Sequence, residues 1–184
     1  MIIEDNFFTK REKQIITATV LSNSFPWFIQ DCSTSIKFPF FSHIGLARSE
    51  SKPNSNIFSL FRDITGRFCK KHKIQIKKIH RHSLNLTYCF PKYKHTDPHV
   101  DHPFKHYVMM FYLNSVSGST IIYNKKHTKK LPLVCLLETK PNFKILKKIC
   151  AQQFKVACFD GQYFHASEFP KNNERRVVSI MTFN

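Results

Sequence analysis

The chain has 184 residues, of which 42% are apolar and 14% aromatic, so it can bury a core within one domain. No run of about 18 apolar residues occurs, and the N-terminus lacks a basic region followed by an apolar stretch. Neither a membrane-spanning helix nor a secretory signal is therefore expected. We expect a soluble, cytoplasmic or otherwise intracellular protein.

A formal net charge of +17 is large for this length. It has two interpretations: a solvated, lysine-rich surface, or attraction to an acidic partner such as nucleic acid, an acidic protein segment or a phosphorylated substrate. The six cysteines include no Cys-x-x-Cys pair. Free thiols in a reducing compartment are therefore favoured over disulfides or a zinc cluster.

A first helix is predicted over residues 9–23. Thr9 and Glu12 have the spacing of a capping box, and apolar residues follow at helical intervals. Pro26 cannot continue a helix and favours an extended conformation for the residue before it. Residues 30–53 carry Ser, Thr, Lys and Pro between short apolar clusters, which predicts an irregular connection.

A second helix is predicted to begin at Asn54 or Ser55, because the apolar residues that follow form one helical stripe. This stripe consists of Ile57, Leu60, Phe61, Ile64 and Phe68. Four basic residues at 70–73 crowd its end, where cations suit the helix dipole. This structural explanation of the basic cluster is preferred to a binding patch.

After residue 73 the apolar period changes from helical to alternating, which predicts strands. The expected extended segments are 74–79, 84–88, 107–113, 119–123, 133–137, 154–159 and 177–183. Lys125 to Lys130 is interpreted as a basic hairpin loop. We predict an α+β, mainly β fold: one domain with helical support over 1–73 and about seven or eight strands in a sandwich or barrel over 74–184.

His99 and Asp101 are two residues apart, so on an extended strand both side chains leave the same face. His165, in a second extended stretch, supplies a third ligand if the two strands face each other across a barrel. Two histidines and one carboxylate leave the opposite side of a metal ion open, a pattern typical of iron(II) oxygenases.

A second pair, His95 and Asp97, has the same spacing but precedes Pro98, where the chain is expected to turn. The pair at 99 and 101 is preferred. His102 and His106 are predicted to lie on a loop surface, where either could meet a substrate.

Several motifs occur in an order that resembles the iron(II) and 2-oxoglutarate dependent oxygenases, in particular their prolyl hydroxylase-like branch and small relatives encoded by some viruses. The motifs are His99–Pro103, Met110–Asn114, Cys158–Gly161, His165–Ser167 and Arg175–Ser179. The resemblance implies a double-stranded β-helix, or jelly roll. It also implies iron(II), 2-oxoglutarate and O2 as cofactors, with ascorbate as a candidate reductant.

By this resemblance His99, Asp101 and His165 hold iron, and an arginine on the strand after the distal histidine binds the far carboxylate of 2-oxoglutarate. Arg175 and Arg176 point to opposite faces of an extended chain, so only one can do so. Arg176 is preferred because it lies deeper in the strand.

Two other side chains are candidates for the pocket. Tyr112 is either a hydroxyl donor to the same carboxylate or a core tyrosine. Asn85 could line the pocket, although a structural role is preferred.

The leading hypothesis is an oxygenase that hydroxylates a protein side chain or a small molecule, with nucleic acid as a less favoured substrate because no basic-aromatic motif lies near the site. The alternative is a non-catalytic basic jelly-roll module that binds nucleic acid or an acidic protein. A third class is a metal-dependent enzyme of the same barrel type that uses no 2-oxoglutarate.

Overall fold

The computed structural model describes residues 1–35, 37–48, 50–139 and 142–184, which form two α-helices and ten strands. In chain order the elements are β1 (Ile2–Glu4), α1 (Lys10–Ala18), β2 (Phe28–Gln30), β3 (Phe40–Leu46), α2 (Ile57–Lys71), β4 (Ile79–Tyr88), β5 (Tyr107–Tyr112), β6 (Ser119–Lys126), the 3-10 helix η1 (Leu137–Thr139), β7 (Ile145–Cys150), β8 (Val156–Asp160), β9 (Tyr163–Ser167) and β10 (Arg175–Phe183).

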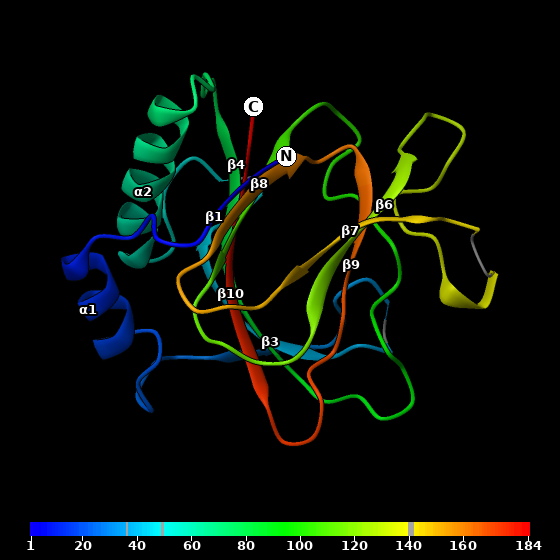
Figure 1. The fold of residues 1–184 in the computed structure, drawn as a ribbon, viewed down its shortest axis with the longest axis horizontal. Coiled ribbons are helices and arrows are strands. Elements are labelled where there is room, and N and C mark those ends of the chain that lie inside the picture. The colour runs from blue at the N-terminus through cyan, green and yellow to red at the C-terminus, as the bar shows by residue number, and fades with distance from the viewer. Residues whose placement is uncertain (36, 49, 140–141) are drawn as a thin grey trace.

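The strands form two antiparallel sheets. The seven-stranded sheet has the order β1-β8-β5-β10-β4-β3-β2, and the three-stranded sheet has the order β7-β6-β9. Both helices lie on one side of the large sheet, and β6, β7 and β9 lie on the other (Figure 1). The predicted mainly β jelly roll with helices on one sheet is confirmed.

Strand β10 shows how the sequence separates the two faces of the large sheet. Val177 and Met181 belong to the core under the helices, whereas Val178 belongs to the core between the sheets. Because side chains alternate along a strand, Arg176 also points between the sheets. A buried arginine is thereby placed in the interior of the barrel.

The predicted capping box is present at the start of α1. Glu12 N donates to Thr9 Oγ1 at 3.2 Å, and Thr9 N donates to Glu12 Oε2 at 2.7 Å. The helix ends at Ala18 and not at residue 23, because the sequence beyond it is rich in Thr, Ser and Asn, which compete for backbone hydrogen bonds. At the end of the helix the Thr19 hydroxyl donates to Ile15 O at 2.7 Å, the same oxygen that accepts from Thr19 N at 2.9 Å.

The second helix, α2, is confirmed with its predicted apolar stripe. Its side chains at 61, 64 and 68 are fully buried against the large sheet. Within the described ranges no helix has both the length and the apolar content needed to cross a lipid bilayer.

The prediction of an irregular connection over 30–53 was wrong, because the segment contains β3, which pairs with β4. Ser42 and His43 interrupt the apolar pattern of this strand, although both are buried. With β1 and β2, three strands of the large sheet precede residue 73. The segment before 73 is therefore not purely helical.

Four other local features also differ from the predictions. Residues 133–137 form no regular strand beyond an isolated bridge at Val134. Strand β7 was missed because its positions 145–148 are all exposed, which leaves no apolar alternation to detect. Residues 74–78 lie outside β4, and β6 extends through Lys126 into the expected hairpin loop.

Candidate metal and cosubstrate site

The segment that carries His99 runs beside β9. His99 N donates to His165 O, and His165 N donates to His99 O, both at 2.9 Å. The two histidines therefore lie side by side in neighbouring segments of one sheet. The expectation that their strands face each other across the barrel was wrong.

Asp101 completes a compact group with these histidines. One ligand atom from each of the three residues lies within 4.8 Å of the others, and His165 Nε2 is 3.4 Å from Asp101 Oδ2. Ligands at about 2 Å from a common ion fall within about 4 Å of one another. A small adjustment of these side chains would bring all three onto one ion.

The hydrogen bonds of the two imidazoles prepare them as ligands. His99 Nδ1 lies 3.1 Å from Asp97 O, and His165 Nδ1 lies 3.1 Å from Tyr163 O. A carbonyl oxygen only accepts, so each Nδ1 carries the proton and donates it. Each Nε2 then keeps a lone pair that can bind a metal ion, a common arrangement of metal-binding histidines.

The protonation states also suit a cation. Burial lowers the pKa of His99 to about 4, and the nearby His165 adds to this effect, so its ring is neutral at neutral pH. Burial acts to raise the pKa of Asp101, but the neighbouring basic groups outweigh it and hold that pKa well below the ordinary value. A neutral histidine and an ionised carboxylate fit a divalent metal ion.

A cavity of about 110 Å³ extends from this group between the two sheets. Val108, Met110, Val178 and Ile180 line its walls, and Arg176 lies at its far end. Its volume is several times that of a single water molecule, for which about 30 Å³ suffices. A small organic acid is a suitable occupant.

Arg176 is 1% exposed, donates hydrogen bonds to hydroxyl groups and lies over the Tyr112 ring, but forms no salt bridge with a carboxylate among the described residues. Its Nη1 donates to Ser167 Oγ, its Nη2 donates to Thr120 Oγ1 at 2.6 Å, and its buried Nε has no partner in the described part of the chain. Burial lowers the pKa of Arg176 because it disfavours the charged form. An anion that entered the cavity would relieve this cost.

Arg175 lies on the opposite face of β10 and is exposed. Its backbone oxygen accepts a hydrogen bond from Asn114 Nδ2 at 2.6 Å. Of the two arginines considered from the sequence, only Arg176 lines the cavity.

Tyr112 is fully buried in the core between the sheets and is not among the described residues that line the cavity. Its hydroxyl donates to Thr120 Oγ1 at 2.8 Å, the same oxygen that accepts from Arg176. Asn85 does line the cavity, and its buried Oδ1 has no partner in the described chain.

Two other histidines lie near the triad and are not among the described residues that line the cavity. His102 and His106 were expected on a loop surface, which was wrong, because they are 6% and 1% exposed. His102 Nε2 lies 2.8 Å from Thr182 Oγ1, and His106 packs directly over Gly161. Thr182 on β10 and Gly161 after β8, which contact them, are remote in sequence, so their contacts could not be read from the local pattern.

The competing pair, His95 and Asp97, lies outside the triad. Asp97 is fully buried and its Oδ1 accepts from Leu137 N at 2.7 Å, which holds the start of η1. His95 Nδ1 lies 2.8 Å from Thr96 O.

Two arginines near the triad were missed by the sequence reasoning. Arg81 Nη1 and Arg48 Nη2 each lie 3.5 Å from Asp101 Oδ1, and both side chains line the cavity. Alternation along β4 places Arg81 on the same face as Asn85, so this arginine could have been found. Nothing local to Arg48 indicates its position.

No family model and no curated protein matches this sequence. Solved structures do resemble its fold. An oxidoreductase of the 2OG-Fe(II) oxygenase family from Burkholderia pseudomallei has a TM-score of 0.65 at 11% identity, covering 100% of this chain and 83% of that protein.

Two further structures show the range of such proteins. A prolyl hydroxylase from Trichoplax adhaerens, bound to a hypoxia inducible factor peptide fragment, has a TM-score of 0.62 at 13% identity over 99% of this chain and 82% of its own. The epimerase SnoN, in complex with Fe3+, alpha ketoglutarate and nogalamycin RO, has a TM-score of 0.62 at 12% identity over 99% of this chain and 77% of its own.

At these identities the likeness concerns the fold. The resemblance inferred from the motifs is confirmed at that level, because the neighbours are 2-oxoglutarate and iron proteins that include a prolyl hydroxylase. One neighbour is a hydroxylase and another an epimerase, so the fold by itself does not determine the reaction.

Proposed function

We propose that this chain is an iron(II)- and 2-oxoglutarate-dependent dioxygenase that hydroxylates a protein side chain or a small molecule and releases succinate and CO2. One observation carries the proposal. A single cavity has the His99, Asp101 and His165 group at one end and the buried Arg176, without a carboxylate partner among the described residues, at the other.

In this proposal the triad holds iron through two Nε2 atoms and one carboxylate oxygen. Iron(II), 2-oxoglutarate and O2 together supply the chemistry: one oxygen atom enters succinate as CO2 leaves, and the other oxidises a C–H bond of the substrate. The protein's own contribution is to hold these ligands in fixed positions, which lowers the entropic cost of reaching the reactive geometry.

Arg176 is assigned to the distal carboxylate of 2-oxoglutarate. A guanidinium presents a planar fork that matches a carboxylate, and Thr120 and Ser167 hold it in place. The apolar walls at Met110 and Val178 keep water from the space between the two ends. Tyr112 is assigned a supporting role through Thr120.

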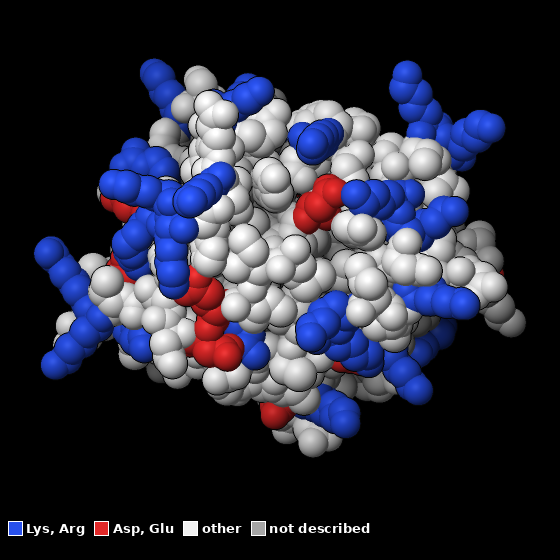
Figure 2. Space-filling model, turned by 45° about the horizontal axis from the view of Figure 1, so that its top comes forward, with Lys and Arg blue, Asp and Glu red and all other residues white. Residues whose placement is uncertain are grey.

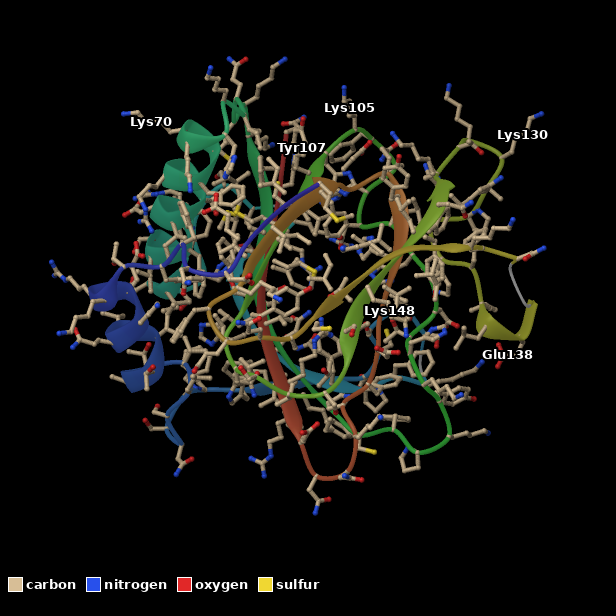
Figure 3. The ribbon with its side chains drawn as sticks, in the orientation of Figure 1. Lys70, Lys105, Tyr107, Lys130, Glu138 and Lys148 are labelled. Carbon is tan, nitrogen blue, oxygen red and sulfur yellow. The ribbon has the colours of Figure 1, made fainter. Side chains whose placement is uncertain are left out.

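The distribution of charge supports a protein or small-molecule substrate over nucleic acid. Lys70 projects from α2, and Lys105 and Lys130 project from two loops, all in different directions (Figure 3). On the face shown in Figure 2, basic side chains stand mostly around the periphery and the centre is largely uncharged. A nucleic acid backbone would be bound by a continuous basic track.

The proposal is tested by measuring succinate formed from 2-oxoglutarate by the iron(II)-loaded protein in air. We expect slow succinate formation even without substrate, and its loss in His99→Ala, His165→Ala and Arg176→Gln. Arg175→Gln is the matched control, because it removes the exposed neighbouring arginine. If the wild type forms no succinate and 2-oxoglutarate does not change its iron(II) absorption spectrum, the proposal is wrong and a non-catalytic module is favoured.

A further inference from the structure

Two arginines stand at the metal end of the cavity, opposite Arg176. Arg81 comes from β4, with a side chain 18% exposed, and Arg48 follows β3, with a side chain 55% exposed. Both lie 3.5 Å from the same oxygen, Asp101 Oδ1, and neither donates a hydrogen bond to a residue in the described ranges. They are close enough to Asp101 for attraction but too far for strong pairing.

The charges at this end do not balance once a metal ion is bound. Asp101 offsets one of the two charges of a divalent ion, and the near carboxylate of 2-oxoglutarate would offset the other. The distal carboxylate would pair with Arg176 in the proposed function. Asp101, the carboxylate that both arginines approach, would then be shared with the metal ion, which leaves an excess of positive charge in a partly buried site.

The distal carboxylate of the cosubstrate is not available to Arg48 and Arg81, because it would pair with Arg176. Arg176 pairs in register with Thr87, six positions along β4 from Arg81, so the two arginines come from different ends of the sheet. The guanidinium of Arg81 lies at Asp101, whereas that of Arg176 lies at Thr120 and Ser167. They serve opposite ends of the cavity.

The surroundings of Arg48 leave room for a second molecule. Arg48 follows the end of β3 that pairs near His82, and its half-exposed side chain extends toward solvent. The apolar residues 38–40 line the cavity nearer to Arg176, because Phe41 pairs with Leu86 and Arg176 with Thr87. A molecule held at Arg48 and Arg81 can therefore extend into solvent.

We infer that Arg48 and Arg81 form an anion-binding subsite for the substrate, which therefore carries a carboxylate or phosphate group near the carbon that is oxidised. This inference rests on the proposed function and specifies its substrate class. Two planar forks around one position suit the oxygen atoms of either anion.

The test uses protein loaded with Mn(II), which does not turn over, and with 2-oxoglutarate. Binding of 2-oxoglutarate is first measured by calorimetry. Inorganic phosphate and 13C-labelled acetate are then titrated, and the relaxation of 31P or 13C by Mn(II) reports an anion that lies close to the metal. Binding of phosphate, of acetate, or of both supports the subsite. Binding of only one of them distinguishes a phosphorylated substrate from a carboxylic acid.

The variants are Arg48→Gln combined with Arg81→Gln, Arg81→Lys, and the exposed control Arg62→Gln, whose side chain contacts Asp63. We expect at least tenfold weaker anion binding in the double variant, partial binding in the lysine variant and no change in the control. Mn(II) affinity should be equal or higher in the double variant, because two repelling charges are removed. This readout also verifies that the site is folded.

Three outcomes would overturn the inference while leaving the proposed function standing: 2-oxoglutarate binds but neither anion does, anions bind equally in the double variant because they ligate the metal alone, or the double variant loses 2-oxoglutarate instead. Failure of the wild type to bind 2-oxoglutarate at all would refute the proposed function and the inference with it.

Discussion

His99 and His165 exchange two backbone hydrogen bonds of 2.9 Å, so two ligand candidates far apart in sequence are fixed side by side by main-chain pairing. Backbone pairing restrains both Cα positions before any ion binds. The protein therefore needs to adjust only side-chain torsions to complete the site.

Removal of either histidine should abolish tight metal binding. For His99→Ala and His165→Ala we expect Mn(II) affinity to fall on the order of 100-fold or more, because even the loss of a supporting residue costs 10–100-fold. Electron paramagnetic resonance of free Mn(II) measures this. His95→Ala is the control, and a similar loss there would contradict the assignment of the triad.

Arg176→Met should increase the stability of the protein and abolish its binding of 2-oxoglutarate. A buried charge without an ionic partner is costly, so its replacement by an apolar side chain of similar length should raise the free energy of unfolding by about 1–4 kcal/mol. The same variant should lose the increase in Tm that 2-oxoglutarate gives to the wild type. Arg175→Met should do neither; thermal denaturation with and without 2-oxoglutarate checks both effects.

Tyr112→Phe should weaken 2-oxoglutarate binding only slightly, because the Tyr112 hydroxyl contacts Thr120 and not the cavity. We expect a loss of about 1 kcal/mol, the net contribution of one hydrogen bond. Thr120→Val, which removes the acceptor shared with Arg176, should cost more. Calorimetric titration would contradict this ranking if Tyr112→Phe were the more damaging change.

His82 should make stability depend on pH. Burial lowers its pKa to about 3, so the unfolded chain binds the proton more readily than the folded chain between about pH 6.5 and 3. Above pH 6.5 the ring is neutral in both states, so the full free energy of unfolding is retained. Below pH 6.5 the free energy of unfolding declines by about 1.4 kcal/mol per pH unit. Urea unfolding at pH 6.5 and 5.5 should show a smaller decline in His82→Gln than in the wild type. An equal decline would refute this role.

Alanine substitutions at two glycines should change the free energy of unfolding in opposite directions. A Cβ at Gly45 would lie 2.0 Å from His82 Nδ1, so Gly45→Ala should destabilise the protein by about 1–3 kcal/mol. A Cβ at Gly66, inside α2, meets no described atom within 4 Å, so Gly66→Ala should stabilise it by about 0.5–1 kcal/mol. Chemical denaturation measures both, and equal signs would contradict the packing described.

The local parts of the fold could be predicted because their signals are local. The capping box at Thr9 and the apolar stripe of α2 depend on residues three or four positions apart, and both are present. Strand β3 escaped prediction because its buried Ser42 and His43 are accommodated by neighbouring strands rather than by their own sequence context. His102 and His106 were misplaced for the same reason.

The sequence by itself determined the jelly-roll resemblance and the shared face of His99 and Asp101, because side-chain alternation is a property of any single strand. Only the tertiary structure decided that His165 lies beside His99, that Arg176 enters the cavity while Arg175 remains in solvent, and that Arg48 and Arg81 approach Asp101. These relationships depend on which strands are neighbours and in which register, and that choice arises from packing over the whole chain.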